Sequence, residues 1–287
     1  MSISIIAITF NEGHYLKDFI INAKKLTNKI FIVDSYSSDD TVDIAITENI
    51  NIVQRKFINF SDQWNFAINN LPYNTDWVLK LDPDERLSDK IIKNINNKII
   101  NQNEFSGFTF DRRLFFLGKK INIKQEILRI WKHKSCKFSE NTVNEYPIID
   151  GKLSKISGEI DHLDSPSLDH WIVKQNNYTT LEAIELFYIY KKQGEKNYLL
   201  ASIQNKRLFF LNIFIYFPMR YQIIFLYFYI MKGLFLNGYH GLLWSKLRCD
   251  VYFWIEIKFK KFKKNRKISL PINSNLGKPD QRCKQYN

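Results

Sequence analysis

Cysteine is scarce in this sequence: only Cys136, Cys249 and Cys283 occur among 287 residues. Three scattered cysteines are too few for a disulfide framework or a cysteine-only zinc site, so we expect a reducing compartment. The first ten residues carry no basic segment ahead of an apolar one and run into polar Asn11 and Glu12, so no secretory signal is visible. The length and the cysteine content together exclude a small disulfide-stapled protein.

Long hydrophobic runs are also missing. The most apolar stretch, residues 208–231, is interrupted by Pro218 and Arg220, and its charge-free runs are only 12 and 11 residues long. A membrane-spanning helix needs about 20 predominantly apolar residues. We therefore expect helices that lie in the membrane interface, and the alternative is that the aromatic residues form a second core.

Glycine-rich phosphate-binding motifs are absent as well. The sequence contains neither G-x-G-x-x-G nor G-x-x-x-x-G-K-[ST], so dinucleotide and P-loop chemistry have no support. If the protein binds a phosphorylated ligand, a metal ion has to neutralise the phosphates.

The positive charge is confined to the C-terminal part. Residues 1–170 hold 22 Lys and Arg against 23 Asp and Glu, whereas residues 171–287 hold 20 against 6. Phe, Tyr and Trp make up 18 of the 55 residues 208–262, and seven of the eleven residues 257–267 are basic with Phe interleaved. This composition favours an anionic membrane surface as partner and no nucleic acid, with a solvated basic helix or an RNA-binding tail as alternatives.

Hydrophobic periodicity predicts an α/β protein. Strand-like runs at 2–10, 29–34, 52–57 and 77–82 alternate with helical patterns at 15–23, 41–48, 61–71 and 88–100. Such alternation implies a mainly parallel, doubly wound sheet, and shorter strand-like pieces between 105 and 161 suggest an antiparallel extension. From residue 167 onward the pattern is helical, so we expect a catalytic domain over 1–165 and a helical, basic, aromatic-rich, membrane-associating region over 166–287.

Polar residues follow the strands where a doubly wound sheet binds its ligands. Asp82-Pro83-Asp84-Glu85 comes directly after an apolar strand, and two carboxylates one residue apart can hold Mg²⁺ or Mn²⁺, although the same residues also suit a turn. Asp34 ends the second strand, and Thr9, Asn11 and Glu12 end the first. Asp34 can accept hydrogen bonds from a ribose or a base, or it can be a turn residue.

These segments resemble the family 2 glycosyltransferases with the GT-A fold. The matching pieces are I-I-A-I-T-F-N-E at 5–12, I-V-D-S-Y-S-S-D-D-T at 32–41 and W-V-L-K-L-D-P-D-E-R at 77–86. Within that family the chain is most similar to the bacterial lipopolysaccharide-core β-glucosyltransferases. That closer likeness adds Gln63-Trp64-Asn65, Asn144-Glu145, Ile160-Asp161-His162, residues 174–179 and residues 232–241.

The resemblance implies a nucleoside-diphosphate sugar donor, commonly UDP-linked. It places Thr9, Asn11, Glu12 and Asp34 around the nucleotide and adds Trp64, Asn65 and Asp82 to the donor-binding residues. Asp82 and Asp84 become the D-x-D site for Mn²⁺ or Mg²⁺, and His162 either completes the metal shell or is packed at a strand end. The branch usually has His-Glu where this chain has Asn144-Glu145, so the carboxylate is kept and asparagine replaces the histidine.

The transfer reaction needs a base as well as a metal. A cation on the diphosphate stabilises the leaving group, and an inverting transferase sets one carboxylate where it can deprotonate the acceptor hydroxyl. Glu145 is the predicted base, with Asp161 and Asp164 as rivals, each of which can equally be structural.

Taken together, the sequence predicts an inverting, metal-dependent glycosyltransferase. We expect it to act on a lipid-linked or lipopolysaccharide acceptor of a bacterial surface glycan (lipopolysaccharide core, capsule or O-antigen), peripherally bound at the cytoplasmic face of the inner membrane. The alternatives are a sugar nucleotidyltransferase and a non-enzymatic basic module that binds membranes or RNA.

Overall fold

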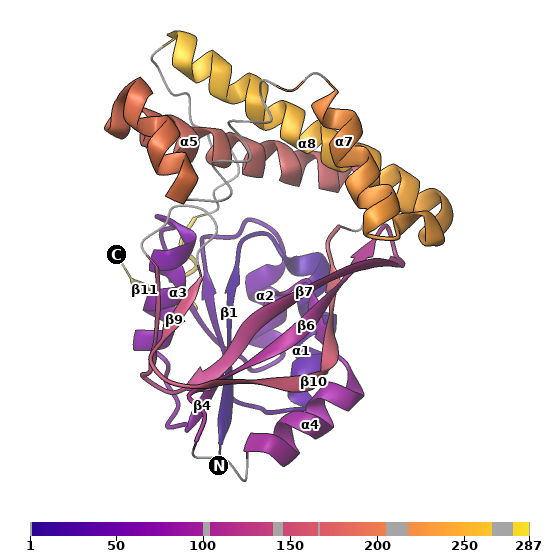
Figure 1. The fold of residues 1–287 in the computed structure, drawn as a ribbon. Coiled ribbons are helices and arrows are strands. Elements are labelled where there is room, and N and C mark those ends of the chain that lie inside the picture. The colour runs from indigo at the N-terminus through magenta and orange to yellow at the C-terminus, as the bar shows by residue number, and fades with distance from the viewer. Residues whose placement is uncertain are drawn as a thin grey trace. The chain divides into compact units, whose positions relative to one another are not determined.

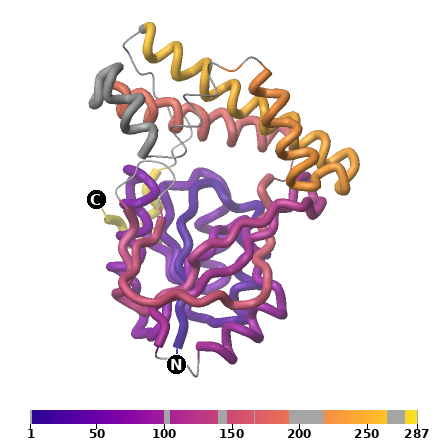
Figure 2. Tube along the Cα trace, viewed as in Figure 1, coloured from indigo at the N-terminus to yellow at the C-terminus, as the bar shows by residue number. Residues whose placement is uncertain are grey.

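The computed structural model describes residues 2–99, 104–139, 146–165, 167–204, 217, 219–265 and 278–286, and for 192–204 and 265 it describes the backbone only. Two compact units are present: residues 1–115, 124–164 and 273–287 form the first, and residues 116–123 and 165–272 form the second. Figure 1 labels the elements and Figure 2 traces the described chain in colour.

The first unit is built on a nine-stranded sheet in the order β11-β3-β2-β1-β4-β7-β6-β10-β5. Its strands are β1 (Ile3–Thr9), β2 (Ile30–Asp34), β3 (Asn51–Arg55), β4 (Trp77–Lys80), β5 (Glu85–Leu87), β6 (Gly107–Phe116), β7 (Lys119–Lys132), β10 (Leu153–Leu163) and β11 (Lys284–Tyr286). The last residue of β6 and the first five residues of β7 belong to the second unit. Its helices are α1 (Gly13–Lys24), α2 (Thr41–Thr47), α3 (Phe60–Asn69) and α4 (Asp89–Ile99). Strands β3, β2, β1 and β4 are parallel, which confirms the predicted doubly wound α/β class.

Two hydrophobic cores cover the sheet because successive side chains of a strand point to opposite faces. One core contains Ile5, Ala7, Ile30 and Ile32 together with apolar residues of α1 and α4. The other contains Ile6, Phe31, Val33 and Trp64. All five residues of β2 are buried, as expected of a parallel strand with helices on both sides. This packing fixes the carboxyl ends of β1 and β2 next to each other.

The extension beyond β4 is mixed rather than antiparallel. Strand β7 runs antiparallel to β4, but β10 runs parallel to β6 and antiparallel to the short β5. The chain passes through a small antiparallel pair, β8 (Cys136–Phe138) and β9 (Pro147–Ile149), before it enters β10. This excursion lets β10 re-enter the sheet in the direction of β6, which local periodicity alone does not reveal.

The second unit is helical. It contains α5 (Leu168–Gln204), α7 (Arg220–Leu226), a π-helical turn η1 (Tyr227–Met231), a 3₁₀ turn η2 (Leu234–Asn237) and α8 (Gly238–Asn265). Helices α5 and α7 both pack against α8, and part of the aromatic content forms this core, for example in the contact between Phe187 and Phe262. Among the described residues, no helix is long and apolar enough to cross a bilayer. Most of the apolar stretch 208–218 lies outside the described residues.

The end of the chain belongs to the first unit. Residues 284–286 form β11, which pairs in parallel with β3 at the edge of the sheet. The sequence pattern predicts a helical region for all residues after 165, and no local pattern in residues 278–286 indicates a strand that pairs with the first unit.

Candidate functional site

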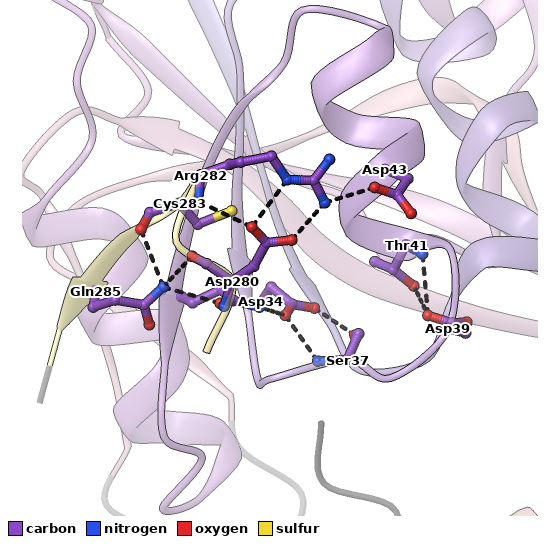
Figure 3. A network of polar contacts seen from close by, with 10 residues as sticks. Asp34, Ser37, Asp39, Thr41, Asp43, Asp280, Arg282, Cys283 and Gln285 are labelled. Carbon is purple, nitrogen blue, oxygen red and sulfur yellow. Dashed lines mark hydrogen bonds and ion pairs between the residues drawn. The ribbon is translucent and has the colours of Figure 1, made fainter. Parts of the chain in front are cut away.

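Asp34 is the centre of a buried network at the carboxyl ends of β1 and β2. Its side chain is fully buried and accepts four hydrogen bonds. The donors are the Thr9 hydroxyl at 2.8 Å, the Ser37 hydroxyl at 2.5 Å, the Ser37 N–H at 2.9 Å and the Gln54 side-chain amide at 2.9 Å. Figure 3 shows Asp34 and Ser37 within this network. Because donors surround both oxygens, the carboxylate is held in one orientation.

The loop after β1 is tied to the loop after β2. The Asn11 N–H donates to the Ser37 hydroxyl, and the Asn11 side chain accepts from the Ser38 N–H, each at 2.8 Å. Asn11 has φ 56°, a left-handed conformation that asparagine tolerates better than most residues. The Glu12 N–H donates to the Thr41 hydroxyl at 2.9 Å. The structure therefore brings four predicted donor-site residues, Thr9, Asn11, Glu12 and Asp34, to one edge of the sheet.

Asp39 links the same two loops. Its carboxylate accepts from the Gly13 N–H at 3.0 Å, at the start of α1, and from the Thr41 N–H at 3.1 Å. The first N–H groups of a helix have no partner within the helix. Asp39 precedes α2 in the chain, but its carboxylate supplies this partner for the Gly13 N–H of α1.

Asp82 pairs with a buried arginine that the sequence analysis did not single out. Asp82 Oδ2 accepts from Arg129 of β7 at 2.9 Å, and Arg129 also contacts the fully buried Glu85. Burial opposes ionisation of Asp82, but the charges of Lys80 and Arg129 outweigh it and hold the pKa of Asp82 below its usual value. Burial likewise acts to lower the pKa of Arg129, and the carboxylates of Glu85 and Asp82 raise it above its usual value. Asp82 is thus a carboxylate at neutral pH.

Asp84 and His162, two of the three predicted metal ligands, are in direct contact. Asp84 Oδ2 is 3.2 Å from His162 Nε2, and the two side chains are 14% and 16% exposed. Two ligand atoms bound at right angles at about 2.1 Å from an ion are about 3 Å apart. The backbone of Asp84 is anchored too, since its carbonyl accepts from the Leu163 N–H at 2.7 Å. The Asp84 carboxylate suits Mn²⁺ or Mg²⁺, and the His162 imidazole suits Mn²⁺ better than the harder Mg²⁺.

The complete predicted metal set is not assembled. Within the described part of the chain, no group of three or more His, Cys, Asp or Glu side chains is close enough to hold a metal ion. Of the three predicted ligands, Asp84 and His162 are adjacent to each other, whereas Asp82 contacts Arg129. A diphosphate or further ligands would have to complete the coordination of a metal bound there.

Trp64 and Asn65 have packing roles in this structure. Trp64 is 1% exposed, and the Lys80 ammonium lies 4.3 Å from its ring centroid. The Asn65 side chain accepts from the Phe138 N–H at 2.8 Å and donates to the Phe138 carbonyl at 3.3 Å, which holds β8 against α3. Their assignment to the donor site stays a prediction.

The predicted base, Glu145, lies with Asn144 outside the described residues. Its rivals are described: Asp161 is opposite Arg86 in the β10–β5 register, and Asp164 is 8% exposed. Asp161 lies in β10, the strand that carries His162, and Asp164 directly follows that strand. The choice among the three carboxylates therefore stays a prediction.

No sequence prediction of a site residue covers Arg129 or Gln54, and Glu85 is predicted only as the last residue of the acidic motif after β4. Arg129 interrupts the apolar run I-L-R-I-W of β7, and a lone charge in such a run is a signal for a buried ion pair. Gln54 is fully buried near the carboxyl end of β3. Ligands bind at the carboxyl ends of parallel strands, and this rule, which predicts Asp34 as a site residue, also applies to Gln54.

Glu85→Ala should destabilise the protein. The substitution removes one of the two carboxylates that pair with Arg129, whose side chain is 6% exposed, and leaves its charge only partly compensated. We expect a loss of about 3 kcal/mol in the free energy of unfolding, measured by urea denaturation. Glu104→Ala, which breaks an exposed pair with Lys152, is the matched control and should cost less than about 1 kcal/mol. Equal losses in the two variants would contradict the structural role of Glu85.

A pocket of about 220 Å³ lies in the second unit rather than among these residues. It is lined by Ile172, Asn176, Trp254, Ile257 and Lys258 of α5 and α8. The Lys258 ammonium donates to the Asn176 carbonyl at 2.7 Å, and burial lowers the pKa of Lys258 to about 8. None of the predicted site residues lines this pocket.

The known proteins that this chain resembles in sequence are glycosyltransferases. The model of the family described as "Glycosyl transferase family 2" matches residues 4–153. An uncharacterized glycosyltransferase of Rickettsia typhi is 27% identical over 219 residues, which cover 70% of this chain and 72% of the relative. The lipopolysaccharide core biosynthesis glycosyltransferase LpsC of Rhizobium meliloti is 24% identical over 196 residues, 64% of this chain and 71% of LpsC.

Among solved structures, glucosyl-3-phosphoglycerate synthase from Mycobacterium tuberculosis, in complex with Mn²⁺, uridine diphosphate and glucosyl-3-phosphoglycerate, matches with a TM-score of 0.34 at 17% identity. The match covers 39% of this chain and 44% of that enzyme, so this chain spans less than half of the length of that structure.

Proposed function

Because this chain belongs to glycosyl transferase family 2, we propose that it transfers a sugar from a UDP-sugar to an acceptor hydroxyl with inversion at the anomeric carbon. The chain is a glycosyltransferase with the predicted GT-A fold, and family membership excludes the non-enzymatic interpretation. The observation that supports the finer proposal best is the contact between Asp84 and His162, which joins the turn after β4 to the end of β10.

Each group at the sheet edge has a proposed task. The nucleoside would bind against the loops that Thr9, Asn11, Glu12 and Asp34 build at the ends of β1 and β2. Asp84 and His162, with Asp82 beside them, would hold Mn²⁺ or Mg²⁺, which when bound neutralises the diphosphate. Arg129 keeps Asp82 ionised and oriented for this purpose.

The proposed reaction balances without a further reactant. The acceptor oxygen forms a bond to the anomeric carbon while the bond from that carbon to the diphosphate oxygen breaks. The electron pair of the broken bond leaves with the nucleoside diphosphate, and the proton of the acceptor hydroxyl goes to the carboxylate of Glu145. Attack from the face opposite the leaving group inverts the anomeric centre.

Glu145→Gln should separate binding from chemistry. Glutamine keeps the size of the side chain but cannot take the proton, so transfer should fall by about 10²-fold while nucleotide-sugar binding persists. The measurement is steady-state transfer together with calorimetric titration of the donor. If Glu145→Gln is fully active and Asp161→Asn or Asp164→Asn is inactive, the base is the other carboxylate.

The proposed acceptor is a bacterial surface glycan. The support is the similarity to LpsC, whose name refers to lipopolysaccharide core biosynthesis, over 64% of this chain and 71% of LpsC. A donor screen tests the function directly: nucleotide sugars are offered with Mn²⁺ or Mg²⁺, and hydrolysis and binding are measured. Mass spectrometry of the surface glycan from a deletion strain should then show a truncated structure, and an unchanged glycan would contradict this acceptor.

We place the enzyme peripherally on an anionic membrane surface at the cytoplasmic face of the inner membrane, through the second unit. Among the described residues between 217 and 239, six large hydrophobic side chains are more than half exposed, namely Phe217, Met219, Ile230, Met231, Leu236 and Tyr239. This segment contains α7, η1 and η2 and lies in the half of the chain that carries the excess positive charge. An apolar surface in a positively charged part of the chain suits insertion between anionic lipid headgroups.

A further inference from the structure

The C-terminal segment 278–286 contacts the network around Asp34. Strand β11 pairs with β3 so that Gln285 is opposite Gln54 and Lys284 is opposite Val53. Figure 3 shows Asp280, Arg282 and Gln285 gathered beside Asp34 and Ser37. This segment lies about 130 residues beyond the end of the family match at residue 153, so it is an addition to the matched region.

This segment fixes the orientation of the Gln54 side-chain amide. Gln54 Oε1 accepts from the Asp280 N–H at 2.7 Å and from the Gln285 side-chain amide at 3.0 Å. Two donors on one side of the amide require its oxygen there, so its NH₂ group has to face the other way. On that side Gln54 Nε2 donates to Asp34 Oδ2 at 2.9 Å.

Asp34 depends on this orientation. If the Gln54 amide rotated by half a turn, its oxygen would face the carboxylate of Asp34, and two acceptors would oppose each other in a fully buried place. Asp34 would keep its contacts with Thr9 and Ser37 but lose the donor that comes from β3. The carboxylate could then shift towards the loop at which the nucleoside is proposed to bind.

The segment is itself anchored to the domain. Arg282 pairs with Asp280 at 2.5 Å and with Asp43 of α2 at 2.6 Å, and the Gln285 amide also donates to the carbonyls of Asp280 and Cys283. Cys283 between them is buried. The turn thus presents the Asp280 N–H and the Gln285 amide to Gln54 as one preformed unit.

We propose that the C-terminal strand is a positioning element of the nucleotide site: through Gln54 it holds Asp34 in the orientation that receives the nucleoside. The inference rests on the proposed function. Coupling between two sites is reciprocal, so nucleotide binding should in turn stabilise β11 against β3. Gln54 and Gln285 act through Asp34 and are positioning residues rather than catalytic ones.

Gln285→Glu tests the coupling because glutamate offers no N–H to Gln54. We expect the dissociation constant of the bound nucleoside diphosphate (UDP, GDP, CDP or dTDP, measured by calorimetry) to rise about 2- to 10-fold. The KM for the donor should rise equally, while kcat and the KM for the acceptor stay unchanged. Lys284→Gln, an exposed change in the same strand, is the control and should alter none of these constants.

A double-mutant cycle shows whether Gln285 acts through Gln54. In a Gln54→Met background, Gln285→Glu should have no further effect on nucleotide affinity, whereas independent effects would add. Hydrogen exchange of the amides in 278–286 should slow when the nucleotide binds to the parent protein. If the parent binds a nucleotide but Gln285→Glu binds it equally well, or if the two effects add, the inference is wrong. If the parent binds none of the four nucleotides with Mn²⁺ or Mg²⁺, the proposed function fails instead.

Discussion

Asp84→Ala should reduce sugar transfer by about 10³-fold or more, because the substitution removes a proposed ligand of the proposed ion that would stabilise the leaving diphosphate. The fold should tolerate the change. The contact that anchors this turn to β10 is made by the Asp84 backbone carbonyl, which alanine retains. The Asp84 side chain is 14% exposed and contacts His162, so a truncated residue 84 leaves an imidazole that water can reach. Transfer is measured with the parent protein and the variant at equal concentrations and at saturating Mn²⁺.

Two controls distinguish loss of the metal ion from a general loss of negative charge. EDTA should inactivate the parent protein as completely as the substitution does, and added Mn²⁺ should restore the parent but not the variant. Asp89→Ala removes a carboxylate five residues further along, which is 87% exposed and pairs with Lys25, so it should leave activity intact. Full activity of the parent in EDTA would contradict the metal assignment. Inactivity of both aspartate variants would indicate a general effect of lost charge.

The sequence predicted the part of the fold that local patterns specify. The run of apolar, β-branched residues at 29–34 predicted a doubly buried strand, and all of β2 is indeed buried. Parallel strands bring their carboxyl ends to one edge, so the polar residues after 9 and 34 could be expected to meet, and Thr9 and Asp34 do. The pairing of Asp84 with His162 came from the family resemblance, since nothing local relates residues 78 positions apart.

The features that were missed depend on pairing between distant segments. Strand β5 has three residues and exists because it pairs with β10. Strand β11 has three residues and exists because it pairs with β3, more than 220 positions away. A three-residue strand has no periodicity to recognise, so such edges appear only when the whole sheet is assembled.

Some basic residues near the end of α8 contact the helical core. The sequence predicts that the lysines of 257–267 together face anionic lipid. Lys260 pairs with the buried Glu256 at 2.5 Å, and the Lys263 ammonium lies 4.6 Å from the centroid of the Tyr190 ring. Arg220 and the Tyr221 hydroxyl also contact Glu256. Replacing Lys260 would therefore disturb the helical core as well as the surface charge, and Lys261 and Lys264 are the better positions for testing charge alone.

Met231→Ser combined with Leu236→Ser should release the protein from membranes. These two side chains are 77% and 74% exposed, the largest exposed fractions among the described hydrophobic side chains of the second unit. Burying such a side chain in an apolar environment contributes about 2 kcal/mol, so losing both should weaken binding to vesicles of phosphatidylglycerol and phosphatidylethanolamine by about 10³-fold. Binding is measured by vesicle sedimentation. Activity on a soluble acceptor should be unchanged, because neither residue belongs to the proposed site.

Salt distinguishes the apolar contribution to this binding from the ionic one. Electrostatic attraction to the vesicles is screened within about 8 to 10 Å at physiological ionic strength, whereas burial of apolar surface is not weakened by salt. Lys261→Gln with Lys264→Gln should therefore reduce binding at low salt and matter little at high salt, while the Met231 and Leu236 variant should bind weakly at both. Ile58→Ser, in the first unit and 66% exposed, is the matched control for loss of an exposed apolar side chain and should bind as the parent does. If the parent protein does not bind anionic vesicles, or if Ile58→Ser is released as readily as the double variant, the assignment of the membrane-binding surface to residues 217–239 is wrong.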